Sequence, residues 1–133
     1  MRPCIRTLLI VLLSFLAITA IPGGIALVAG FNAPPVDMLK GSPFSSFFIP
    51  GLALVILVGG IACLAVATIC ARSRHAVRAS LIAGSSIVVF ELVEIIYIGS
   101  PAGPARIMQI LYLALGLSIT SLTLIARTRR DAR

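Results

Sequence analysis

Four long apolar runs divide the sequence, and shorter connections rich in arginine, glycine and proline separate them. The runs cover about residues 7–31, 49–71, 78–98 and 107–126. Each has close to the roughly 20 residues that an α-helix needs to cross the hydrocarbon core of a bilayer. The pattern therefore predicts an all-α fold in which a single domain of four transmembrane helices forms a bundle.

The composition points the same way. Hydrophobic residues make up 59% of the 133 residues and charged residues 11%, whereas charged residues are about 25% of an ordinary soluble domain. The net charge of +7 comes from short basic clusters between the apolar runs. No domain-sized polar surface remains to bind nucleic acid, so we expect the lipid bilayer, and no nucleic acid, as a partner.

Basic residues mark one side of the predicted bundle. Two of them, Lys40 and Arg106, lie in the connections after the first and third runs, and nine lie in the other polar segments: Arg2, Arg6, Arg72, Arg74, Arg78, Arg127, Arg129, Arg130 and Arg133. Basic residues concentrate on the cytoplasmic side of membrane proteins. We therefore expect both termini in the cytoplasm, with a bacterial plasma membrane as the location.

Proline and glycines predict an irregularity in the first span. Pro22 removes a backbone donor and, together with Gly23 and Gly24, predicts a kink or partial break in the outer half. The irregularity either serves helix packing or opens a polar site.

Small residues predict where helices approach closely. The second span carries them at every fourth position, as Gly59, Cys63, Ala67 and Ala71. Such a stripe lets two membrane helices pack tightly, and the partner is either another span or a second copy of the chain. Gly84 and Gly116 are the corresponding packing positions in the third and fourth spans.

Two carboxylates, Glu91 and Glu94, lie within the third apolar run. At about 100° per residue they share one helix face with Ser80, Gly84, Ile87 and Ile98. An ionised carboxylate in hydrocarbon is costly unless something compensates it, so this face should turn inward. Counting about 1.5 Å per residue places Glu91 near the middle of the bilayer and Glu94 nearer the outer surface.

The fourth span carries a matching polar face, formed by Gln109, Tyr112, Gly116, Thr120 and Thr123. A short turn joins the third and fourth spans, which predicts that they are antiparallel neighbours with their polar faces in contact. Glu94 should then lie near Arg106 and Gln109, and Glu91 near Tyr112. For Glu94 we expect either an ion pair with Arg106 or a functional role. For Glu91 we expect a proton or cation site, a contact to a partner subunit, or an internal hydrogen bond.

No catalytic or metal constellation accompanies the two acids. Ser85 and Ser86 have no histidine base nearby, because the one histidine, His75, lies in a connection. Two carboxylates supply too few ligands for a metal site, and the three cysteines have no CxxC spacing. We therefore expect neither an enzyme nor a cofactor.

Several short motifs carry a resemblance. Gly41-Ser42-Pro43-Phe44 precedes Ile49-Pro50-Gly51, and later come the segments 94–99 (EIIYIG) and 109–112 (QILY). In these the chain resembles a group of short, uncharacterised bacterial four-span membrane proteins. In size and span count it is also similar to DoxX-like proteins. The resemblance implies the four-span fold and carries no activity.

These observations predict a non-enzymatic integral membrane protein in an accessory or assembly role. Its buried carboxylates would make contacts within the bundle or with another subunit, which is either a second copy or a different membrane protein. The alternative is a small proton-coupled or cation-coupled transporter that uses Glu91.

Overall fold

The computed structural model describes residues 1–30, 43, 45–99 and 103–131, and the regular secondary structure in these residues is all helical. The elements are α1 (Pro3–Ala29), α2 (Phe48–Ala53), the π-helix η2 (Leu54–Gly60), α3 (Ile61–Cys70), α4 (Ala76–Ile98) and α5 (Pro104–Asp131). The segments α2, η2 and α3 follow one another without a gap and form one span. Four spans are long and apolar enough to cross a membrane. The predicted all-α fold of four transmembrane helices is confirmed, and the chain is an integral membrane protein.

The helices extend beyond the apolar runs at the ends that carry arginine. Helix α1 begins at Pro3, where proline is tolerated because the first turn of a helix lacks a partner for its N–H. Helix α5 continues to Asp131, through the basic residues that end the last span. Most of the connection at 32–48, including Gly41, Ser42 and Phe44, lies outside the described residues, as do residues 100–102.

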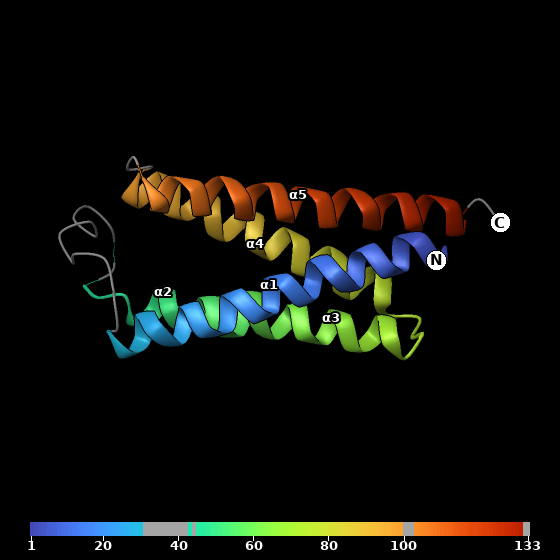
Figure 1. Ribbon diagram of the computed structural model, residues 1–133, viewed down its shortest axis with the longest axis horizontal. Coiled ribbons are helices and arrows are strands. Elements are labelled where there is room, and N and C mark those ends of the chain that lie inside the picture. The colour runs from blue at the N-terminus through green and yellow to red at the C-terminus, as the bar shows by residue number, and fades with distance from the viewer. Residues whose placement is uncertain (31–42, 44, 100–102, 132–133) are drawn as a thin grey trace.

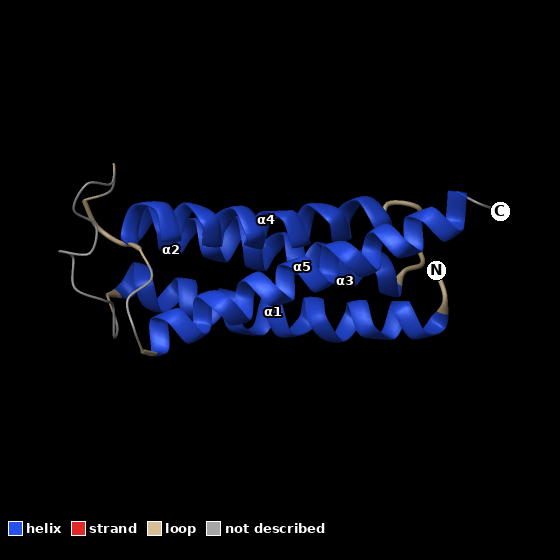
Figure 2. Ribbon diagram, turned by 90° about the horizontal axis from the view of Figure 1, so that it is seen from above, coloured by secondary structure: helices blue, strands red, loops and turns tan. Residues whose placement is uncertain are grey.

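The bundle consists of two helical hairpins laid side by side. Helix α1 packs against the span formed by α2, η2 and α3, and α4 packs against α5 (Figures 1 and 2). Contacts of α3 with α4 and of α1 with α5 join the two hairpins. Both termini lie at one end, with Arg2, Arg6, Arg72 and Arg74, and we call this the basic end. The opposite end, where α1 ends and α2 begins, is the loop end. The placement of the basic end in the cytoplasm stays a prediction.

Apolar side chains fill the inside of the bundle and also cover its outside. Leu9, Leu13 and Leu16 of α1 are completely buried. On the outside, Ile18 is 71% exposed and Ile96 is 76% exposed. A helix that is apolar all around suits a protein whose outer surface meets lipid rather than water.

Helices α1 and α2 touch backbone to backbone near the loop end. A Cβ atom on Gly24 would lie 2.6 Å from the carbonyl oxygen of Gly51, and a Cβ on Gly51 would lie 2.8 Å from the carbonyl oxygen of Gly24. Helix α1 runs unbroken through Pro22, so the partial break predicted there is not found. Membrane helices tolerate proline because neighbouring groups satisfy the backbone that it frees. Of the two glycines after Pro22, Gly24 therefore serves close packing against α2.

The small-residue stripe of the second span faces the bundle only at its start. Gly59 is buried, and a Cβ there would lie 2.5 Å from the side chain of Ile21. Cys63 and Ala67 are exposed, so of the two predicted partners another span is not found there, and packing of these residues against a second copy of the chain stays a prediction. A repeat of four drifts by about 40° at each step because an α-helix has about 3.6 residues per turn. The stripe thus rotates away from α1, and Ala62 and Ala65 take its place in the core.

Candidate functional site

Helices α4 and α5 pack along the two polar faces that the sequence predicts. A Cβ on Gly84 would lie 2.5 Å from the hydroxyl oxygen of Thr120, and a Cβ on Gly116 would lie 2.6 Å from the side chain of Ile87. These glycines let the helix backbones approach closely, as small residues do in membrane bundles. The close approach holds Glu91 and Glu94 against the first half of α5.

The two carboxyl groups form a pair inside the bundle. Glu91 is only 2% exposed, and its carboxyl group is within hydrogen-bonding reach of the Glu94 carboxyl group. Glu94 is partly buried and also lies within reach of the Gln109 side chain. Two carboxyl groups can share a hydrogen bond only when one of them carries a proton. The pair is therefore able to hold a proton inside the membrane.

Gln109 and Tyr112 complete the polar cluster and tie three helices together. Gln109 is 3% exposed, and its Nε2 donates a hydrogen bond of 3.0 Å to the carbonyl oxygen of Gly99. This bond links the start of α5 to the end of α4. Tyr112 is 8% exposed and lies within hydrogen-bonding reach of Thr19 on α1. The structure thus brings together Glu91, Glu94, Gln109 and Tyr112, four of the residues selected from the sequence.

Two oxygens of this cluster have no hydrogen-bond donor among the described residues. They are Oε2 of Glu91 and Oε1 of Gln109, and both are buried. The bond from Nε2 of Gln109 to a carbonyl fixes which end of its amide is the oxygen. A buried acceptor without a partner costs about 1–3 kcal/mol. Oε1 of Gln109 is an acceptor, and so is Oε2 of Glu91 when Glu91 is ionised, so a group that satisfies both must then donate hydrogen bonds or carry positive charge.

Arg106 was predicted as the partner of Glu94. It lies in the first turn of α5 and is exposed, whereas Glu94 lies against Glu91 and Gln109. The predicted ion pair between Glu94 and Arg106 stays a prediction.

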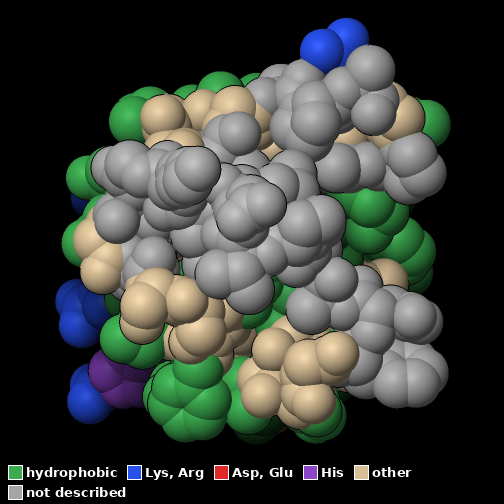
Figure 3. Space-filling view, turned by 90° about the vertical axis from the view of Figure 1, so that its left-hand side faces the viewer, with side chains coloured by type: hydrophobic (Ala, Val, Ile, Leu, Met, Phe, Trp, Pro, Cys, Tyr) green, Lys and Arg blue, Asp and Glu red, His purple; other side chains and the backbone are tan. Residues whose placement is uncertain are grey.

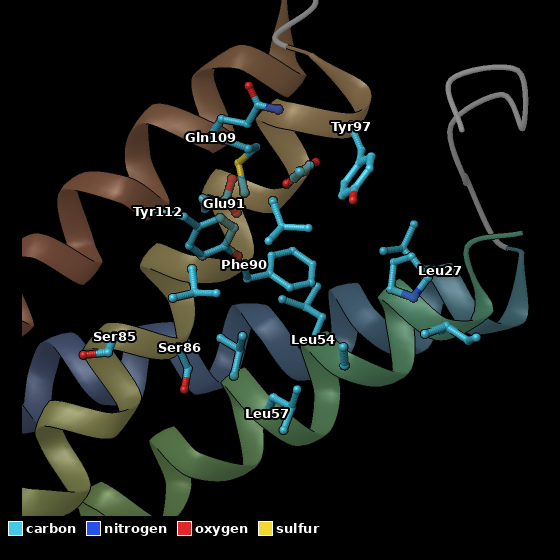
Figure 4. Close-up of a pocket in the computed structure, with 18 of the residues that line it drawn as sticks. Leu27, Leu54, Leu57, Ser85, Ser86, Phe90, Glu91, Tyr97, Gln109 and Tyr112 are labelled. Carbon is cyan, nitrogen blue, oxygen red and sulfur yellow. The ribbon is translucent and has the colours of Figure 1, made fainter. Parts of the chain in front are cut away.

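A cavity of about 720 Å³ opens beside the acidic pair. In Figure 4, Glu91, Gln109 and Tyr112 lie on the side of α4 and α5, whereas Leu54 and Leu57 come from η2. Further lining side chains are almost all apolar or aromatic, among them Leu27, Phe47, Phe90 and Tyr97. The cavity therefore combines a large apolar wall with a small group of polar atoms, which is typical of sites for small organic molecules.

The mouth of the cavity lies between the second and third spans. Ile49 and Leu57 on one side and Val89 and Val93 on the other line the cavity and are exposed. In a membrane, exposed apolar side chains at this level of a span would meet lipid. Figure 3, which looks onto the loop end, shows no acidic side chain among the atoms drawn in colour.

The π-helix η2 supplies the middle of the cavity wall with Leu54, Leu57 and Val58. Segments of π-helix are rare and frequently lie at functional sites. The apolar run that contains η2 carries one polar residue, Thr68, which lies beyond η2 and does not mark its register, so the sequence predicts neither the π-helix nor the cavity. The adjacent pair Gly59-Gly60 is the one local sign of irregular geometry.

No group of three or more His, Cys, Asp or Glu residues that could hold a metal ion occurs in the described part of the chain. Cys4, Cys63 and Cys70 are free thiols and all are exposed. The polar cluster is thus the one site among the sequence predictions where buried ionisable groups meet a cavity.

Comparison of the chain with protein-family models, with curated proteins and with solved structures finds no match. The resemblance to short bacterial four-span proteins and to DoxX-like proteins therefore stays a prediction. The function is inferred from the geometry of the site.

Proposed function

We propose that this integral membrane protein binds an amphipathic organic cation, which enters the cavity from the bilayer and pairs with Glu91 and Glu94. The observation that carries the proposal is the carboxyl group of Glu91. It is buried, it lines the cavity, and its Oε2 has no donor among the described residues. A protonated amine would supply both the donor and the positive charge.

The remainder of the cavity suits the apolar part of such a molecule. Its volume of about 720 Å³ falls within the range of about 300–1,000 Å³ that is common for small-molecule sites. The aromatic rings of Phe90, Tyr97 and Tyr112 line it, and aromatic faces attract cations in desolvated sites. A neutral apolar molecule would leave the Glu91 oxygen without a donor, so the site favours a ligand with charge.

The predicted role in subunit contacts is a variant of the same chemistry. A basic side chain of a partner subunit, or of a second copy of the chain, would satisfy the same oxygens and give the protein an accessory role. The intramolecular contacts of Glu94 with Glu91 and Gln109 leave Oε2 of Glu91 unsatisfied. The contact with Glu94 therefore satisfies at most one of the two Glu91 oxygens.

A second candidate function is transport of the cation in exchange for protons. The observation that favours it is the shared reach of the two carboxyl groups, because their hydrogen bond requires a proton that an incoming cation would displace. In this proposal Glu91 is the group that exchanges proton for cation, and the plasma membrane of a bacterium is the location.

Binding can be tested with dansylcadaverine, a fluorescent primary amine with an apolar body, and with its N-acetylated form as the uncharged control. The purified protein in dodecyl maltoside micelles should bind the amine and not the acetylated form. Glu91→Gln should lower the affinity about 10-fold to 100-fold, because a hydrogen bond to a charged group contributes about 1.5–3 kcal/mol. Thr128→Val, which removes a hydroxyl bonded to the Leu124 carbonyl far from the cavity, should leave affinity unchanged.

Equal affinity for the amine and its acetylated form would refute the proposal without any variant. If neither form binds and Glu91→Gln breaks a stable oligomer, the partner contact is the better account. For transport, protein in liposomes should couple entry of the amine to a change in internal pH, and Glu91→Gln should abolish that coupling.

A further inference from the structure

A second cavity, of about 370 Å³, lies at the basic end. Its walls come from the start of α1, the end of α3, the connection that follows, the start of α4 and, through Ala126, α5. The lining residues include Arg6, Arg72, Ser73, Arg74, Ile69 and Ala76. Three arginines thus line one hollow where the helices begin and end, which is the level at which a bundle of this length leaves the hydrocarbon core.

Among the described side chains, none neutralises the positive charge of this cavity. Arg6 is half-buried, and its Nη2 donates to the carbonyl oxygen of Ile69 at 3.4 Å. Its Nε is buried and has no acceptor among the described residues. The Nε of Arg74 contacts the Nε2 of His75 at 3.4 Å. Within the described ranges, none of Arg6, Arg72 and Arg74 forms an ion pair with a carboxylate.

The backbone of the connection holds two of these arginines in place. Arg72 has φ 53°, the one positive φ at a non-glycine residue in the described chain. Its N–H donates to Ile69 and that of Ser73 to Thr68, which closes the end of α3. A left-handed conformation is unfavourable for arginine, so the surrounding structure must impose it. The turn places Arg72 and Arg74 at the same cavity as Arg6, which lies near the start of α1.

We infer that the cavity at the basic end binds a phosphate group, and that the anionic headgroup of a phospholipid in the adjoining leaflet supplies it. Guanidinium groups match phosphate oxygens in pairs, and arginine favours such planar recognition. The ligand differs from that of the membrane cavity in sign of charge and in place, so this inference does not depend on the proposed function. The bare Nε of Arg6 is the donor that the phosphate would satisfy.

Native mass spectrometry of the full chain, stripped of lipid in detergent, tests the inference. Phosphatidylglycerol should remain bound, whereas zwitterionic phosphatidylcholine should not. Arg6→Gln and Arg72→Gln should each weaken retention of phosphatidylglycerol about tenfold, the loss expected for one charged contact. Arg78→Gln is the matched control, because Arg78 is exposed at the same end and does not line the cavity.

If Arg78→Gln weakens retention of phosphatidylglycerol as much as Arg72→Gln does, the inference is overturned, since binding then depends on overall charge and not on a specific site. Equal retention of the two lipids by the parent protein would overturn it as well. A third arm uses millimolar inorganic phosphate. Displacement of phosphatidylglycerol by inorganic phosphate in the parent, and not in Arg72→Gln, would assign the site to soluble phosphates, whereas no displacement is expected for a lipid site.

Discussion

The adjacent glycines Gly23 and Gly24 allow a sharp test of the packing between α1 and α2. A Cβ on Gly24 would lie 2.6 Å from the Gly51 carbonyl oxygen and 3.0 Å from the backbone nitrogen of Val55, whereas a Cβ on Gly23 has its nearest neighbour at 3.9 Å, in Leu54. Ordinary contacts begin near 3.4 Å, so Gly24→Ala must part the two backbones from 2.6 Å to 3.4 Å, by about 0.8 Å.

The expected cost of that separation is about 1–3 kcal/mol of unfolding free energy, the usual range for overpacking a tight contact. Gly23→Ala adds the same methyl group one residue earlier, where it would make an ordinary van der Waals contact with Leu54. Because alanine suits a helix better than glycine, it should range from neutral to about 1 kcal/mol more stable. The pair of variants thus separates the effect of the contact from the effect of helix propensity.

The measurement is unfolding by sodium dodecyl sulfate added to dodecyl maltoside micelles, followed by the near-ultraviolet circular dichroism of the tyrosines. The Gly24→Ala protein should unfold at a lower fraction of sodium dodecyl sulfate than the parent and Gly23→Ala. Identical midpoints for the two variants would refute the backbone contact between α1 and α2.

Two further predictions concern orientation and the polar cluster. With Cys63 replaced by Ala, the exposed Cys4 and Cys70 at the basic end should react with a membrane-impermeant maleimide in inverted vesicles only; labelling of right-side-out vesicles would reverse the predicted orientation. Gln109→Leu removes the 3.0 Å hydrogen bond to the Gly99 carbonyl and should cost about 1 kcal/mol in the same detergent titration. The exposed Ile110→Leu serves as its control, and an unchanged midpoint for Gln109→Leu would contradict the assigned bond.

The sequence predicted the spans and the polar seam because both depend on local rules. Hydropathy marks the helices, and the period of the α-helix puts Glu91 and Glu94 on one face. Because the turn between them is short, α5 packs beside α4, and this places Gln109 and Tyr112 next to Glu91 and Glu94. Gln109 lies beside Glu94 as the sequence predicts, and the contact of Glu94 with Glu91 follows from their spacing of three residues on one helix face.

The two cavities could not be predicted because each depends on the distance between hairpins. The contact between Gly24 and Gly51 holds α2 and η2 against α1 rather than against α4. The membrane cavity lies in the space that this leaves between η2 and α4. In an apolar run no polar face identifies the inner side, so the sequence leaves open whether Cys63 and Ala67, which are exposed, pack against another span or a second copy. In the sequence, the arginines at the basic end indicate only the orientation of the chain in the membrane. That Arg72 and Arg74 line one cavity with Arg6 is visible only in the folded structure.

The π-helix η2 allows the second span to lose a residue without disturbing its packing, which the other spans cannot do. Its hydrogen bonds close over five residues, so each turn contains about one residue more than a turn of α-helix. Loss of one residue between Leu54 and Gly60 would let the segment wind as ordinary α-helix, with Ala62 and Ala65 still turned toward α1. In α4 the same loss would rotate everything beyond it by about 100° and carry Glu91 from the cavity wall into the lipid. Changes in chain length within this protein should therefore be sought in η2 and not in the helix that bears the acids.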